Sequence, residues 1–114
     1  MTDRGKKVLE EILGKPKAVN QLAAYQKDSI VSSRIIQKSA GNITFFAFDE
    51  GQELSEHAAP FDALITVFDG KVSVMVKNKW HALGAGDAII LPANVPHAVK
   101  AVTRFKMMLT MIRS

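Results

Sequence analysis

The amino-acid sequence predicts an all-β domain, an antiparallel barrel preceded by a short N-terminal helical arm. From Ile30 onward, short segments rich in Val, Ile, Phe and Thr alternate with turn residues, which is typical of a sandwich or barrel. The 114 residues are enough for one domain of ordinary size and too few for two. We therefore expect an arm over residues 1–29 and a barrel over residues 30–114.

The arm is expected to be helical. Thr2 or Asp3 is placed to cap a first helix, which Pro16 ends. Its apolar stripe consists of Val8, Leu9, Ile12 and Leu13. A second short helical or irregular piece spans residues 19–26. Because a DNA-binding helical domain needs about three packed helices, we interpret these pieces as a lid or a docking arm.

The barrel strands are expected between turns rich in Gly, Pro, Asn and Asp. They span residues 30–38, 42–48, 63–68, 71–77, 80–83, 88–91, 97–101 and 104–112. Asp69-Gly70, between two apolar runs, is the strongest hairpin signal in the chain. The segment 63–68 is apolar on both faces, which predicts that another layer or subunit covers its outer side.

Composition and charge exclude several classes of protein. The chain has no cysteine, so disulfides and thiolate chemistry are excluded. The net charge of +4 does not predict a nucleic-acid partner, because the basic residues are mostly spaced singly and are not interleaved with aromatics. No apolar run reaches the length of about 18 residues that would predict a membrane-spanning helix, and the charged N-terminus does not resemble a secretory signal. We expect a cytoplasmic protein with neither a nucleic-acid nor a membrane partner.

Histidine is the residue type in this chain best suited to chemistry near neutral pH. His81 follows Trp80 in an expected strand and is interpreted as a rim residue. His57 and His97 each lie where a loop enters a strand, a position at which a rigid scaffold presents functional side chains. An imidazole both donates and accepts hydrogen bonds, so these two histidines are candidates for ligand contact or for acid and base chemistry.

The stretches around these two histidines resemble the two conserved motifs of the cupin superfamily. In that family the first motif runs G-x5-H-x-H-x3-E-x6-G, and the second runs G-x5-P-x-G-x2-H-x3-N. The chain supplies the matching residues Gly51, His57 and Gly70 for the first motif, and Gly86, Pro92 and His97 for the second. The resemblance implies a single-domain jelly-roll barrel that encloses a small-molecule pocket and forms a homodimer.

The departures from the motifs concern metal binding. Metal-dependent cupins hold their ion with both histidines and the glutamate of the first motif and the histidine of the second, but Ala59 and Ala63 stand at two of these positions. On a regular strand, the face that carries His57 would continue through Ala59, Phe61 and Ala63. A tight site usually needs at least three protein donors, so we expect no cofactor. The alternative is a weakly bound divalent metal at His57 and His97.

Two classes of function stay open. The first is a small-molecule-binding protein with a metal-free pocket lined by His57, His97, Phe61, Ala59, Ala63 and Met107. The second is a metal-dependent enzyme, an oxygenase or isomerase that acts on a small organic acid or sugar. A third interpretation is that the two histidines have no function and that their ring nitrogens form hydrogen bonds only with the neighbouring backbone. Met107 either adapts to a ligand or fills the core.

Overall fold

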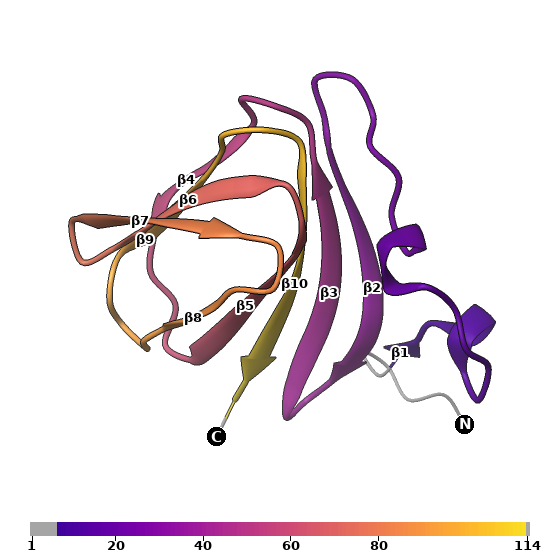
Figure 1. Cartoon of the computed structure of the whole chain (residues 1–114). Coiled ribbons are helices and arrows are strands. Elements are labelled where there is room, and N and C mark those ends of the chain that lie inside the picture. Colours follow the sequence, from indigo (N-terminus) through magenta and orange to yellow (C-terminus); the bar gives the residue numbers. More distant parts are fainter. Residues whose placement is uncertain (1–6, 114) are drawn as a thin grey trace.

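The computed structural model describes residues 7–113, which form two antiparallel sheets that face each other (Figure 1). The larger sheet has six strands in the order β1-β2-β3-β10-β5-β8, and the smaller has four in the order β4-β9-β6-β7. The strands are β1 Lys7–Val8, β2 Ile30–Lys38, β3 Gly41–Phe48, β4 Glu53–His57, β5 Asp62–Asp69, β6 Lys71–Val76, β7 Lys79–Gly84, β8 Ala88–Leu91, β9 His97–Ala101 and β10 Phe105–Ile112. The predicted all-β jelly-roll architecture is confirmed.

One strand of the barrel is missing from the sequence-based prediction. The residues of β4 were expected to form a loop, but they pair with β9 in the smaller sheet. Leu54 is the single apolar side chain in this strand and the one residue of the five that is half-buried. Because the other four residues are polar and exposed, the alternation that reveals a strand is absent from the sequence.

The N-terminal arm is helical only to a minor extent over the described residues, because its helical parts are short 3₁₀ turns and not the longer helix expected from the spacing. The arm contains the two-residue strand β1 and two three-residue 3₁₀ turns, η1 at Glu10–Ile12 and η2 at Val19–Gln21. The expected caps Thr2 and Asp3 lie outside the described residues. A short isolated helix is marginal in water, whereas the N–H of Leu9 gains a hydrogen bond to the carbonyl of Ile35 on β2. Within residues 7–113, no helix is both long and apolar enough to cross a membrane.

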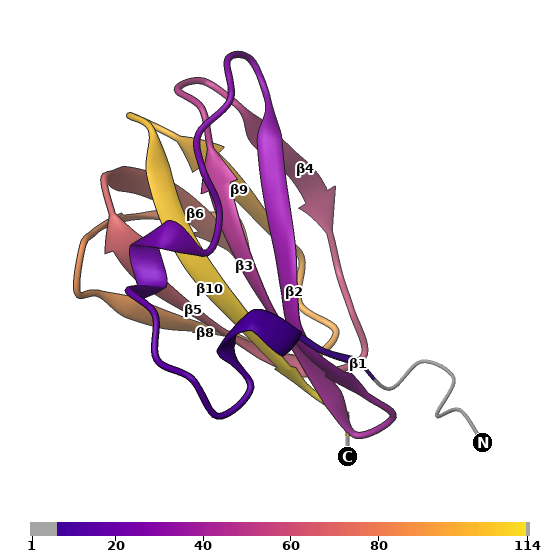
Figure 2. The same ribbon diagram turned by 90° about the vertical axis from the view of Figure 1, so that its right-hand side faces the viewer.

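Residues 9–26, here called the strap, cross the outer face of the six-stranded sheet (Figure 2). Their apolar side chains pack with buried Phe45 and Ala47 of β3. Tyr25 anchors the strap, because its hydroxyl donates a 2.5 Å hydrogen bond to Asp69. The cationic groups of Arg104 and Lys106 lie over the Tyr25 ring, so both packing and charge fix the strap on the sheet.

The strap covers part of the outer side of β5. Phe68 on this side packs under the strap, as predicted, whereas Leu64 on the same side stays 38% exposed.

The main core fills the space between the two sheets. In β5 the odd-numbered residues Ala63, Ile65 and Val67 point inward and are buried, which is the alternation expected of a strand with one inner face. Phe48 and Phe105 are fully buried and stack with their ring centroids 4.6 Å apart. The core closes at the hairpin between β5 and β6, where Gly70 has φ +75° and a Cβ would lie 1.8 Å from the carbonyl oxygen of Arg104. That hairpin requires glycine.

Candidate functional site

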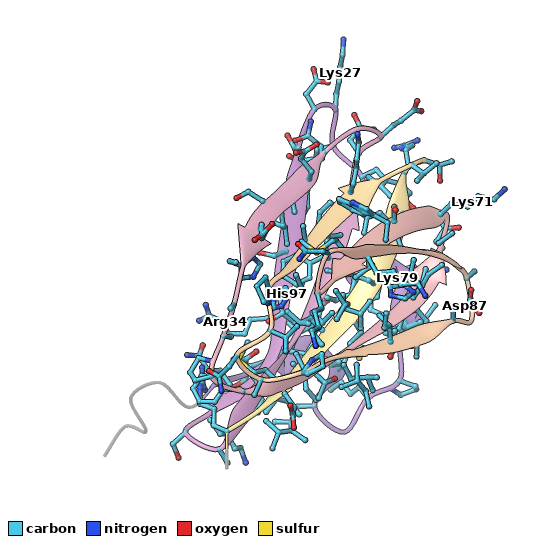
Figure 3. All side chains as sticks on the ribbon, turned by 90° about the vertical axis from the view of Figure 1, so that its left-hand side faces the viewer. Lys27, Arg34, Lys71, Lys79, Asp87 and His97 are labelled. Atoms are coloured by element: carbon cyan, nitrogen blue, oxygen red, sulfur yellow. The ribbon has the colours of Figure 1, made fainter. Side chains whose placement is uncertain are left out.

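Strands β4 and β9 bring His57 and His97 together. His57 ends β4, His97 begins β9, and the two residues are partners in the register of the sheet. Their Nε2 atoms lie 3.1 Å apart, and the two rings meet edge to face with centroids 4.3 Å apart. Figure 3 looks onto the four-stranded sheet and labels His97, the residue at which β9 begins. The two motif histidines, which are 40 positions apart in the chain, therefore form one site.

Two loops hold the histidines in place. The N–H of Asn94 donates a 2.7 Å hydrogen bond to the carbonyl of Ala59, which joins the loop after β4 to the loop before β9. Asn94 has φ 64°, a left-handed conformation that Asn tolerates better than most residues. The N–H of Lys77 donates to the carbonyl of Pro96, directly before His97. The positions of both imidazoles are thus set by backbone hydrogen bonds.

The hydrogen bonds of the two rings define what their Nε2 atoms can do. The Nδ1 atom of His57 lies 2.8 Å from the carbonyl oxygen of Ser55, and the Nδ1 atom of His97 lies 3.2 Å from that of Val95. A carbonyl only accepts hydrogen bonds, so each Nδ1 carries a proton and donates. In two neutral rings, both Nε2 atoms would then present lone pairs to each other. One additional proton between the Nε2 atoms satisfies the pair and gives it a single positive charge.

The two histidines differ in their exposure to solvent. His97 is 7% exposed, and it is the one buried polar side chain among residues 7–113, whereas His57 is exposed. Burial lowers the pKa of His97, the charge on His57 lowers this pKa further, and the hydrogen bond with Val95 partly opposes both effects. Burial and the neighbouring imidazole therefore make His97 resist protonation.

The loop between β4 and β5 interrupts the regular strand that was expected over residues 57–63. β4 ends at His57 and β5 begins at Asp62, so Ala59 and Phe61 lie in the connecting loop and do not continue one strand face. Pro60 stands inside this loop and lacks the N–H that a strand ladder needs. The guanidinium of Arg113 lies 5.2 Å from the centroid of the Phe61 ring.

Ala63 and Met107 belong to the main core. Both face inward, Ala63 at 7% and Met107 at 1% exposure, in the same hydrophobic cluster. Ala63 is paired in register with Met111, not with Met107, which lies four residues away along β10. The structure therefore places Met107 in the packed centre of the barrel, away from the strand ends that carry the histidines.

The residues present do not fit a tightly bound metal ion. Among residues 7–113, no group of three or more His, Cys, Asp and Glu side chains is placed to hold one. Asp62 carries the carboxylate nearest to the missing motif glutamate, and its oxygen accepts a 2.8 Å hydrogen bond from the N–H of Ala93. The donor set of the described site is two imidazoles, fewer than the three protein ligands that tight sites usually have.

Two antiparallel sheets that face each other, with a pair of histidines contributed by two strand ends, define a jelly-roll barrel. The family model described as "Cupin domain" matches residues 44–113 of the chain. The chain belongs to the cupin family. A search of curated proteins found no match.

Solved structures support this assignment. A conserved protein of unknown function from Streptococcus pyogenes is 30% identical, with a TM-score of 0.85 and 88% of each chain covered. A cupin 2 conserved barrel domain protein from Leptotrichia buccalis is 37% identical, with a TM-score of 0.80 over 82% of this chain and 46% of that one. A cupin superfamily protein from Desulfitobacterium hafniense shares the fold at 22% identity, with a TM-score of 0.80 over 88% of this chain and 91% of that one. The chain spans less than half of the Leptotrichia protein.

Proposed function

We propose that the chain is a small-molecule-binding cupin that holds its ligand without a metal at the His57–His97 pair. The observation that carries this proposal is the 3.1 Å approach of the two Nε2 atoms while both Nδ1 atoms donate to backbone carbonyls. A single shared proton makes the pair a donor that a ligand oxygen can capture. Exposed His57 would meet the ligand first, and buried His97 would accept or return the proton.

The rival function is that of a metal-dependent enzyme acting on a small organic acid or sugar. The convergence of two imidazole nitrogens favours it, because neutral Nε2 atoms are common metal ligands. Ala59 and Ala63 argue against it, since they remove two of the four donors that metal-dependent members of the family use. We therefore derive no catalytic step through a metal.

The expected ligand is small and polar. The pair offers one N–H donor, which suits a hydroxyl or carboxylate oxygen.

The proposal is tested by nuclear magnetic resonance of the imidazole nitrogens. We expect a library of small neutral and carboxylated compounds to contain members that move the signals of His57 and His97 together, because the two rings share one proton. The same compounds should leave His81 unmoved, and His57→Ala should abolish the response at His97. If no compound moves the paired signals, the two histidines have no ligand and the third reading, structural histidines, replaces this proposal.

We also propose that two copies of the chain associate through the six-stranded sheet. Its outer face carries a row of residues in register across five strands, formed by Ile36, Ile43, Thr110, Leu64 and Ile90, and all of them except Thr110 are apolar. Ile90 is 62% exposed, and apolar side chains gathered on one face mark an association surface. Sedimentation should give a dimer for the parent chain and a monomer for Ile90→Lys, and a monomeric parent at micromolar concentration would remove this part of the proposal.

A further inference from the structure

Trp80 lines a groove on the outer face of the four-stranded sheet, the side that Figure 3 presents to the viewer. In the register of the sheet, Trp80 lies beside Met75, and Met75 lies beside Ala98. Met75 is 4% and Ala98 is 7% exposed, so together they form an apolar floor under the groove. The groove holds about 300 Å³. It is separate from the barrel interior, because His97 points inward and its neighbour Ala98 points outward.

Trp80 keeps about half of its surface open to solvent. Its exposed fraction is 52%, although a large apolar surface is normally covered in a folded protein. Met75 beneath it is already buried, and the indole nevertheless keeps half of its surface in water. This leaves an aromatic surface available to a molecule that enters the groove.

The opposite wall of the groove is acidic. It is formed by β4, whose residues Glu53, Leu54, Ser55 and Glu56 line the groove. Within the described chain, residues 7–113, neither carboxylate forms an ion pair. Lys100 lies opposite Glu53 and is the one cation among the lining residues. The groove therefore has an excess negative charge, and Glu56 has no cationic partner in the register.

We propose that this groove binds a small organic cation of the alkylammonium class. A cation over the face of an indole is attracted by the ring quadrupole, and Trp is the best of the aromatic side chains for this interaction. The free carboxylates add Coulomb attraction on the other side of the ligand. An anion of the same size would be repelled by the same wall. The alkyl groups of the ligand would rest on the floor of Met75 and Ala98.

The indole is also a reporter of its own site, because Trp80 is the single tryptophan of the chain. We would titrate the protein with choline and, in parallel, with its neutral isostere 3,3-dimethyl-1-butanol, at constant ionic strength, and follow the tryptophan fluorescence. We expect a saturable change with choline at a Kd on the order of a millimolar and at least about fivefold weaker binding of the isostere. Equal binding of both probes, or no saturable change with choline, would overturn the proposal.

Matched variants separate the acidic wall from general effects of charge. Glu56→Gln should weaken choline binding by about threefold, whereas Glu50→Gln, in the turn before β4 and outside the groove, should leave it unchanged. Equal losses in both variants would show that only the overall charge matters and would contradict a site at this groove. His57→Ala should not alter choline binding, so this proposal and the one for the histidine pair can fail independently.

Discussion

The barrel core and the histidine pair lie between the same two sheets but are built in opposite ways. In the core, Phe48 and Phe105 have no exposed surface and make only apolar contacts with the hydrophobic cluster. At the strand ends, one imidazole is buried, the other is open to solvent, and their Nε2 atoms lie 3.1 Å apart. The comparison shows that apolar packing stabilises the barrel. The histidine pair, which is the candidate reactive group, lies at the edge of this packing, where water reaches a polar side chain.

The largest expected effect belongs to the core. Phe105→Ala removes a fully buried ring that stacks on Phe48, and we expect the free energy of unfolding to fall by about 3–5 kcal/mol. Chemical denaturation measures the change. Val102→Ala, at a side chain that is 54% exposed, is the matched control and should cost much less. Similar losses at both positions would contradict the assignment of the core.

The next largest effect on the free energy of unfolding is expected from a substitution in the strap. Tyr25→Phe keeps the ring under the cations of Arg104 and Lys106 but removes the hydroxyl that donates to Asp69. We expect a loss of about 1 kcal/mol in the free energy of unfolding, together with faster hydrogen exchange in the strap. Asp69→Asn should reproduce most of this loss, and the double variant should cost little more than either single one. Fully additive losses would show that the hydroxyl and the carboxylate act separately.

The sequence predicts the strands of the barrel better than it predicts the histidine site. The strands 30–38, 88–91 and 97–101 lie where their apolar alternation placed them, because burial on one face of a sheet leaves that pattern in the sequence. The polar strand β4 leaves no such pattern, since its stability comes from pairing with β9. The helical spacing of the arm is misleading for a related reason, because tertiary packing on the sheet outweighs local propensity there.

The candidate site was predicted in part. The motif spacing identifies His57 and His97, and the structure joins them. The orientation of the two rings depends on the carbonyls of Ser55 and Val95, whose positions follow from the backbone and have no signal in the sequence. The face proposed for residues 57–63 fails, because the loop between β4 and β5 interrupts the strand.

The dependence of the unfolding free energy on acid pH should distinguish the contribution of the histidine pair from that of the core. Burial and the neighbouring charge lower the pKa of His97 below its ordinary value of 6.5, so the unfolded chain binds the proton more readily than the folded one. The contribution to stability is therefore complete above pH 6.5 and is lost as the pH falls through the lowered pKa. His97→Gln should flatten this part of the profile of unfolding free energy against pH, while His81→Gln should not. Parallel profiles for the parent and His97→Gln would contradict the burial effect.

Restoring the missing donors should create a metal response that the parent lacks. Ala59→His combined with Ala63→Glu supplies the four side chains that metal-dependent cupins use. We expect Zn²⁺ or Ni²⁺ to raise the Tm of this double variant. Ala82→His, at an exposed position on β7, is the control for non-specific binding to an added imidazole and should show no comparable rise.

The most direct test of a metal-free histidine pair is the thermal unfolding of the unmodified protein with and without Zn²⁺ or Ni²⁺. An ion at about 100 times its Kd would add about 2.7 kcal/mol to the free energy of unfolding, which a thermal scan resolves in a domain of this size. With two imidazoles as the donor set, we predict no metal-dependent rise in Tm. A clear rise that disappears in both His57→Ala and His97→Ala would contradict the account and move the metal-dependent enzyme to first place.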